Sequence, residues 1–185
     1  MTPQTLSKPP SPAVTRRKTR LVAVLGAVIA LVATMFVCAS SANATATSTG
    51  AYANAVLKLM NQERAANHLP ALKWDSRLIS SAYKHNLAMA SKNSMSHQVS
   101  GEASLGTRID RTGFPWTMAA ENIGWSTNRS TTGAVNLQKA MYNEKAPANG
   151  HRLNILSKYY KYVGVNVVTD TRTGKIWLTE DFARA

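Results

Sequence analysis

The sequence predicts an α+β domain in which helices cover a small antiparallel sheet. Two observations carry this prediction: stretches with helical periodicity fill the first part of the chain, and a strand–turn–strand pattern closes it. A third observation is that no segment of the chain repeats. The chain has 185 residues, of which 44% are hydrophobic and 17% charged, so we expect one folded domain around one core.

The first 44 residues have the pattern of an export leader. The basic stretch Arg16–Arg20 precedes a run without charge, Leu21–Val37, and the small-residue sequence Ala42-Asn43-Ala44 follows. This order is typical of a secretory signal peptide, so we expect cleavage near Ala44 and a secreted, extracellular protein. The alternative is an uncleaved membrane anchor with the domain facing outside, because 17 residues lie at the lower limit of a membrane span. Residues 45–50 are expected to be a short tether, and residues 51–185 the domain.

Removal of the leader would also change the chemistry and charge of the protein. Cys38 is the only cysteine, so the mature chain would have no thiol or disulfide. The leader holds five of the 22 Lys and Arg residues and none of the nine acids, which leaves 17 basic residues and a net charge of +8. Such a domain favours anionic wall polymers or lipid headgroups as partners. The basic residues are scattered and no nucleic-acid motif accompanies them, so we expect no nucleic-acid binding and a monomer.

The helices are predicted from apolar residues that recur every three or four positions. In the first helix Tyr52, Val56 and Met60 follow this spacing, and Pro70 lies just beyond its end. In the second, Asp75 or Ser76 is placed to accept hydrogen bonds from the free N–H groups of the first turn. The predicted helices cover residues 51–67, 76–93 and 132–143, with a shorter one at 105–112 that stops at Gly113.

The strands are predicted from alternation and β-branched residues. Residues 119–125 form a short, partly alternating segment. Residues 162–168 and 175–182 are rich in β-branched and aromatic residues and flank the turn-forming stretch 170–174. We therefore expect one strand in the middle of the chain and a β-hairpin at its end.

Local motifs of familiar enzymes are missing: the sequence has no G-x-S-x-G, no glycine-rich phosphate loop, no H-E-x-x-H and no paired cysteines. Five short stretches stand out instead. In order they are Met95-Ser96-His97, Ala120-Glu121-Asn122-Ile123, Met141-Tyr142-Asn143-Glu144, Gly150-His151-Arg152-Leu153-Asn154-Ile155-Leu156 and Tyr162-Val163-Gly164-Val165. Their order and rough spacing resemble the CAP (SCP-like) superfamily, which includes cysteine-rich secretory proteins, insect venom allergens (antigen 5) and plant pathogenesis-related proteins. The resemblance extends from about Tyr52 to Phe182 and is to the bacterial extracellular type, since the disulfides of animal and plant members are absent.

This resemblance implies a three-layer α-β-α sandwich with a large cleft. It also implies that His97, Glu121, Glu144 and His151 line that cleft together. The lipid and sterol ligands of eukaryotic members suggest a lipid-like ligand for this chain.

The residue types of this quartet suit two arrangements. Two imidazoles and two carboxylates can bind a divalent cation such as zinc, and we expect weak metal binding through His97 and His151, with Glu121 and Glu144 as cleft acids. Without a cation, each acid can instead accept a hydrogen bond from a histidine. His85, which lies within a predicted helix, is expected to be solvated or to have a packing role.

Three functions are compatible with the sequence, and no catalytic residue can be assigned. The first is a binding module for an extracellular ligand, either lipid-like or wall-associated. The second is a metal-dependent peptidase or esterase in which Glu121 or Glu144 acts as general base on a water. The third is a passive wall-associated interaction protein retained by its positive charge. We favour the first, because the sequence shows no nucleophile and no oxyanion hole.

Overall fold

The structure is a computed structural model that describes residues 4–9 and 46–185. The apolar run and the predicted cleavage site of the leader lie outside the described residues. Within the described ranges, no helix has both the length and the apolar character needed to cross a membrane.

The centre of the domain is a six-stranded sheet in the order β1-β4-β6-β5-β2, with β3 beside β5. All neighbouring strands are antiparallel except β3 and β5, which run parallel. The strands are β1 (Gln4–Ser7), β2 (Ala46–Ser48), β3 (Lys73–Trp74), β4 (Met118–Ser126), β5 (Tyr162–Asp170) and β6 (Lys175–Arg184).

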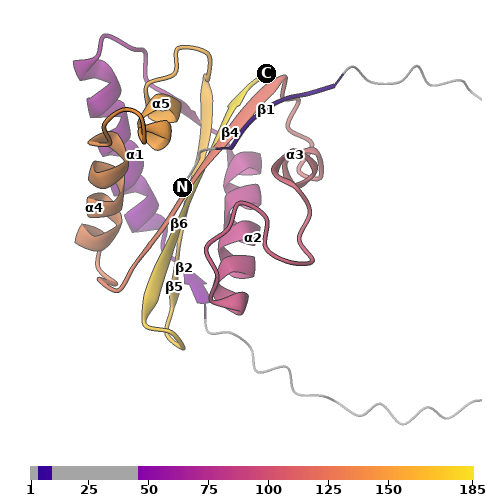
Figure 1. Ribbon diagram of the computed structural model, residues 1–185, viewed down its shortest axis with the longest axis vertical. Coiled ribbons are helices and arrows are strands. Elements are labelled where there is room, and N and C mark those ends of the chain that lie inside the picture. Colours follow the sequence, from indigo (N-terminus) through magenta and orange to yellow (C-terminus); the bar gives the residue numbers. More distant parts are fainter. Residues whose placement is uncertain (1–3, 10–45) are drawn as a thin grey trace, which may run out of the picture. The chain divides into compact units, whose positions relative to one another are not determined.

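Helices cover both faces of this sheet, as Figure 1 shows. One face carries α1 (Gly50–Ala66), α4 (Thr131–Tyr142) and α5 (Gly150–Ile155). The other carries α2 (Ser76–Lys92) and α3 (Leu105–Asp110). The predicted α+β class and the three-layer α-β-α sandwich are confirmed.

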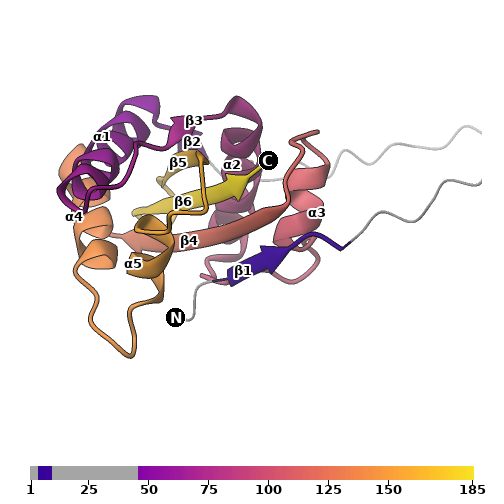
Figure 2. The same cartoon turned by 90° about the horizontal axis from the view of Figure 1, so that it is seen from above.

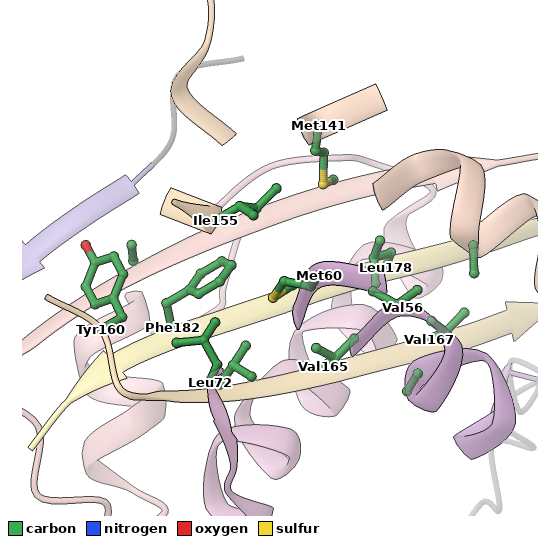
Figure 3. Close-up of a cluster of buried hydrophobic side chains, with 14 of the residues drawn as sticks. Val56, Met60, Leu72, Met141, Ile155, Tyr160, Val165, Val167, Leu178 and Phe182 are labelled. Atoms are coloured by element: carbon green, nitrogen blue, oxygen red, sulfur yellow. The ribbon is translucent and has the colours of Figure 1, made fainter. Parts of the chain in front are cut away.

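Each layer of helices has its own apolar contact with the sheet. On the α1 side, Val56 and Met60 pack against Val165, Leu178 and Phe182 from the two hairpin strands (Figure 3). On the other side, one cluster forms around Leu78, Leu105 and Ile109, and another around Met89 and Trp177. Burial of apolar area on both faces fixes the alternation of the strands, and therefore which polar side chains face which layer.

The helix boundaries follow from local chemistry. The carboxylate of Asp75 accepts the backbone N–H of Arg77 at 2.9 Å and starts α2. The same helix ends at Asn93, which adopts the left-handed conformation with φ 48°. Gly113, just beyond α3, has φ 75°, which an L-residue with a Cβ adopts only with strain.

Three regions differ from the sequence-based expectation. Residues 4–7, expected within the leader, form β1 and pair with β4. Residues 46–48, expected within a tether, form β2 and pair with β5, because the edge of β5 offers backbone groups that this short stretch can satisfy. The backbone N–H of Thr49 continues this pairing by donating to Val167 at 2.9 Å. Residues 150–155, expected only as part of a motif, form the short helix α5.

Candidate functional site

The candidate site is built around two consecutive residues of β4, Glu121 and Asn122. Because successive side chains of a strand point to opposite faces, these two reach different helix layers. Glu121 contacts Arg108 from α3, whereas Asn122 contacts the backbone of His151 in α5. The strand thus links groups on both faces of the sheet.

Glu121 is completely buried and has two strong partners. Its Oε1 lies 2.9 Å from Nδ1 of His97, and its Oε2 accepts from Nη2 of Arg108 at 2.6 Å. Arg108 also donates to the backbone oxygen of His97 at 3.2 Å, so the loop that carries His97 is fixed by the same guanidinium. These are charge-assisted hydrogen bonds with the short lengths typical of that class.

His85 belongs to the same network, and a solvated role for it is therefore wrong. It is fully buried, and its Nδ1 lies 2.9 Å from both carboxylate oxygens of Glu102. Its Nε2 lies 3.7 Å from Oε1 of Glu121. Arg108 connects the two acids, because its Nε is 3.6 Å from Glu102 while its Nη2 binds Glu121.

The second histidine–acid pair lies at the start of α5. Nδ1 of His151 is 2.5 Å from Oε1 of Glu144. The other oxygen of Glu144 accepts the backbone N–H groups of His151 at 2.9 Å and of Arg152 at 3.4 Å. Glu144 therefore satisfies free N–H groups of the first helical turn, a role that the N-cap residue Asn149 does not perform with its side chain. Nε2 of His151 is buried and has no hydrogen-bond partner among the described residues.

In the structure, the four predicted residues form two pairs, His97–Glu121 and His151–Glu144. The connection between the pairs runs through Asn122, whose Nδ2 donates to the backbone oxygen of His151 at 3.3 Å and to Glu180 Oε2 at 3.0 Å. That the pairs share one cleft stays a prediction. A cavity of about 380 Å³ lies beside α2 and the loop at 99–103. Glu102 and Arg108 of the Glu121 network line it, but none of the four predicted residues does.

Among the described residues, the four form two histidine–acid pairs and no cluster of three or more metal-ligating side chains. No group of three or more His, Cys, Asp or Glu side chains within residues 4–9 and 46–185 is placed to hold an ion. Each carboxylate is engaged by the Nδ1 of a histidine instead. Metal binding through His97 and His151 stays a prediction.

The pKa of Glu121 is lowered despite its burial. Burial alone would raise it, but the hydrogen bond from His97 and the positive charge of Arg108 outweigh that effect, so Glu121 is ionised. Its neighbour across the β4–β6 ladder is Asp181. Burial raises the pKa of Asp181 well above its usual value, and the nearby charge of Glu121 raises it further. The two facing carboxyls therefore have pKa values shifted in opposite directions, that of Glu121 downward and that of Asp181 upward.

Sequence reasoning missed Arg108 and the acidic partners of His85, although both residues carried a signal. Arg108 lies three positions after Leu105 and next to Ile109, on the apolar face of a predicted helix. His85 lies three positions after Ala82 and four before Met89, also on an apolar face. A titratable group on a buried helix face requires a partner, which is what the network provides.

Comparisons with known proteins agree with this architecture. The model of the cysteine-rich secretory protein family (CAP) matches residues 57–182. The uncharacterized protein YkwD of Bacillus subtilis (strain 168) is 31% identical over 135 residues, which are 73% of this chain and 48% of that protein. The chain thus spans about half the length of this curated relative.

Solved structures give the same result. An extracellular protein containing an SCP domain from Bacillus anthracis str. Ames is 27% identical, with a TM-score of 0.62 over 74% of this chain and 41% of that one. An outer surface protein from Borrelia burgdorferi is 14% identical, with a TM-score of 0.63 over 75% and 96% of the two chains, and shows the fold alone. The family match includes both histidine–acid pairs, and this chain belongs to the cysteine-rich secretory protein (CAP) family.

Proposed function

We propose that this chain is an extracellular binding protein that holds its ligand next to the histidine–acid pairs. The observation that carries the proposal is that both acids already have their hydrogen-bonding capacity committed to protein donors. Glu121 is bound by His97 and Arg108, and Glu144 by the side chain and backbone of His151. Such acids orient histidines and are poorly placed to activate a water.

The lowered pKa and the burial of Glu121 support binding over hydrolysis. A general base works best with a pKa near the working pH and must reach the proton that it removes. Glu121 has a lowered pKa and no exposure to solvent, so it is a weak and inaccessible base. The two histidines are better suited to contact a ligand, because a carboxylate holds Nδ1 of each ring in place.

The extracellular location is supported by the predicted leader and by the similar protein from Bacillus anthracis, which is described as extracellular. The ligand class that fits such a location is lipid-like or wall-associated. A net charge of +8 after cleavage would favour encounter with anionic wall polymers or headgroups.

The test is binding of the exported protein to a purified cell-wall suspension and, separately, to phosphatidylglycerol vesicles. We expect His97→Ala and His151→Ala each to weaken binding at least about tenfold, the loss of one or two charge-assisted hydrogen bonds. His68→Ala is the matched control, because His68 is an exposed histidine beyond the end of α1. Equal binding by all three variants would overturn the proposal, as would ester or peptide hydrolysis that Glu121→Gln abolishes.

Passive retention by charge gives a different result in the same assay. Binding that salt of about 0.5 M removes equally from the parent chain and every histidine variant would reflect screened surface charge and not the site. We expect a histidine-dependent part of the binding to survive that salt.

A further inference from the structure

The edge of β4 beside Glu121 is where the chain's own first residues lie. Figure 2 shows β1 running along β4, at the edge of the sheet. The pairing is antiparallel and in register from Gln4 opposite Glu121 to Ser7 opposite Met118. The backbone N–H of Lys8 extends it by donating to Thr117 at 3.1 Å. We propose that this edge is a peptide-binding site that takes an extended segment as an added strand.

Two side chains of the segment at residues 4–8, Leu6 and Lys8, contact distinct groups of the domain. Leu6 packs against the apolar cluster that includes Leu105, Ile109 and Trp116. Two positions later, Nζ of Lys8 lies 2.8 Å from Oδ1 of Asp110 and 5.6 Å from the centre of the Trp116 ring. An apolar cluster followed by an acid with an aromatic neighbour suits a peptide that has an apolar residue two positions before a lysine.

The opposite side of the segment also has a partner. Thr5 forms a side-chain hydrogen bond with Tyr160, which is 2% exposed. The segment is therefore held by main-chain pairing at its edge and by side-chain contacts on both faces of the sheet. Strand addition of this kind draws affinity from the main chain and specificity from alternate side chains.

The position nearest the histidine–acid pair is filled poorly. Gln4 lies opposite Glu121, and its Oε1 is buried without a hydrogen-bond partner among the described residues. A buried amide oxygen that lacks a donor weakens the hold on this segment. A peptide with an apolar or hydrogen-bond-donating side chain at this position would displace the segment at residues 4–8.

Cleavage near Ala44 would remove residues 4–8 and leave β4 as an edge strand with unpaired N–H and C=O groups. Its occupant in the exported protein is then a peptide segment of another protein, with an apolar residue two positions before a lysine. This inference deepens the proposed function, on which it rests, by naming a peptide as the partner at the Glu121 side of the site.

The test uses the full chain with Leu6→Asp, which vacates the edge, and a fluorescein-labelled peptide Gln-Thr-Leu-Ser-Lys-Pro with the sequence of residues 4–9. Fluorescence anisotropy is expected to show saturable binding, at least about tenfold tighter than to the parent chain, whose own segment competes. The same peptide carrying Leu6→Asp is expected to bind at least about tenfold more weakly, because its charge cannot enter the apolar cluster. Lys8→Glu in the chain is a second way to vacate the edge, which changes the exposed ion pair with Asp110 and the contact with the Trp116 ring but leaves Leu6 in place. Circular dichroism checks the fold of each variant.

A charge exchange tests the recognition of lysine. Asp110→Lys is expected to weaken binding of the original peptide and to favour the peptide carrying Lys8→Glu, a reversal that a general loss of structure would not produce. No saturable binding to either vacated chain, or equal binding of the original and Leu6→Asp peptides, would overturn the proposal. So would a dimer of the parent chain that Leu6→Asp converts to monomer, because the edge would then belong to a second copy.

The peptide experiment and the binding assays of the histidine variants can fail independently of each other. If His97→Ala and His151→Ala lose wall or vesicle binding and no peptide binds, only the peptide inference fails. If the peptide binds to the vacated edge and the histidine variants bind walls and vesicles normally, the ligand contact assigned to the histidines fails.

Discussion

At Glu121, a carboxylate without any solvent contact is held ionised by the groups around it. Arg108 is almost as deeply buried, at 6% exposure, and its closest acidic contact is Glu121 at 2.6 Å. Each charge therefore depends on the other, because an isolated ion in this environment would lose its hydration without replacement. Glu102 at 3.6 Å is a weaker partner for the same guanidinium.

Replacing Glu121 by glutamine should lower the free energy of unfolding by about 3 kcal/mol, because Arg108 would keep its charge without its main partner. Urea unfolding at pH 7, followed by circular dichroism, measures the loss. Glu144→Gln is the matched control: its side chain is 23% exposed and no buried cation depends on it, so a loss of about 1 kcal/mol is expected. Equal losses in the two variants would show that burial of the Arg108 charge does not matter.

The site was only partly predictable at this scale. The four residues His97, Glu121, Glu144 and His151 could be named from the order of the family's motifs, and the pairing of each acid with a histidine was one of two arrangements left open. The link through Asn122 could not be predicted, because it depends on which face of β4 each residue occupies and on the docking of α5. Both depend on tertiary structure, and the spacing of residues along the sequence does not reveal them.

Glu180, next to Asp181 in β6, is another fully buried acid with a raised pKa, in contrast to Glu121. Burial raises the pKa of Glu180 to about 8, and the charge of Glu63 adds to this effect while the hydrogen bond from Asn122 opposes it. The folded state thus keeps a proton that the unfolded chain releases above about pH 4.5. Stability must therefore fall as the pH rises from about 4.5 to about 8, and this contribution is constant above that range.

Glu180→Gln should remove this dependence, because the amide is neutral at every pH and its oxygen can still accept from Asn122. We expect the variant and the parent chain to unfold alike at pH 4, and the variant to be more stable at pH 8 by up to about 4 kcal/mol. Urea unfolding at intervals between these two pH values measures the difference. Parallel stability curves for the two chains would mean that Glu180 is ionised in the folded protein.

Among the elements, α2 and β5 approach each other most closely where β5 has a glycine. A Cβ built on Gly164 would lie 2.1 Å from the backbone carbon of Leu78 and 2.3 Å from the backbone nitrogen of Ile79. Backbone atoms cannot yield as a flexible side chain can. The helix that carries His85 is therefore positioned against the sheet by the absence of a side chain at this residue.

Gly164→Ala should force α2 away from the sheet and destabilise the fold by about 3 kcal/mol, at the upper end of typical overpacking costs. Gly50→Ala is the matched control, since a Cβ there meets nothing within 4 Å and alanine favours the helix that begins at this residue. Thermal unfolding of the two variants gives the comparison. A melting temperature of the Gly164 variant equal to that of the parent would show that the layers can separate at little cost.

The sequence predicted the longer elements well and the short ones poorly, for a physical reason. The helices α1, α2 and α4 and the β5–β6 hairpin present apolar faces long enough to show their periodicity. The strands β1, β2 and β3 have four, three and two residues and are held by backbone pairing to a neighbour. Helix α5 has six residues and depends on Glu144 at its start. None of these has a periodic signal of its own.

For the molecule as a whole, cleavage of the predicted leader would decide which surface its partners meet. Residues 1–44 contain Cys38 and five basic residues. They also contain the segment that pairs with β4. The exported domain would therefore differ from the full chain in net charge, in thiol content and at one edge of its sheet.

The exported protein should begin at Thr45, which intact mass measurement and N-terminal sequencing of the protein from the culture medium would establish. Because Cys38 would leave with the leader, the midpoint of thermal unfolding of this protein should be the same with and without a reductant. The full chain expressed without export is the control: it keeps one thiol and can form a reducible dimer between two copies. Recovery of a protein that retains residues 21–37 would instead support the uncleaved anchor. In that case residues 4–8 would stay in the chain and could compete with any peptide for the edge of β4.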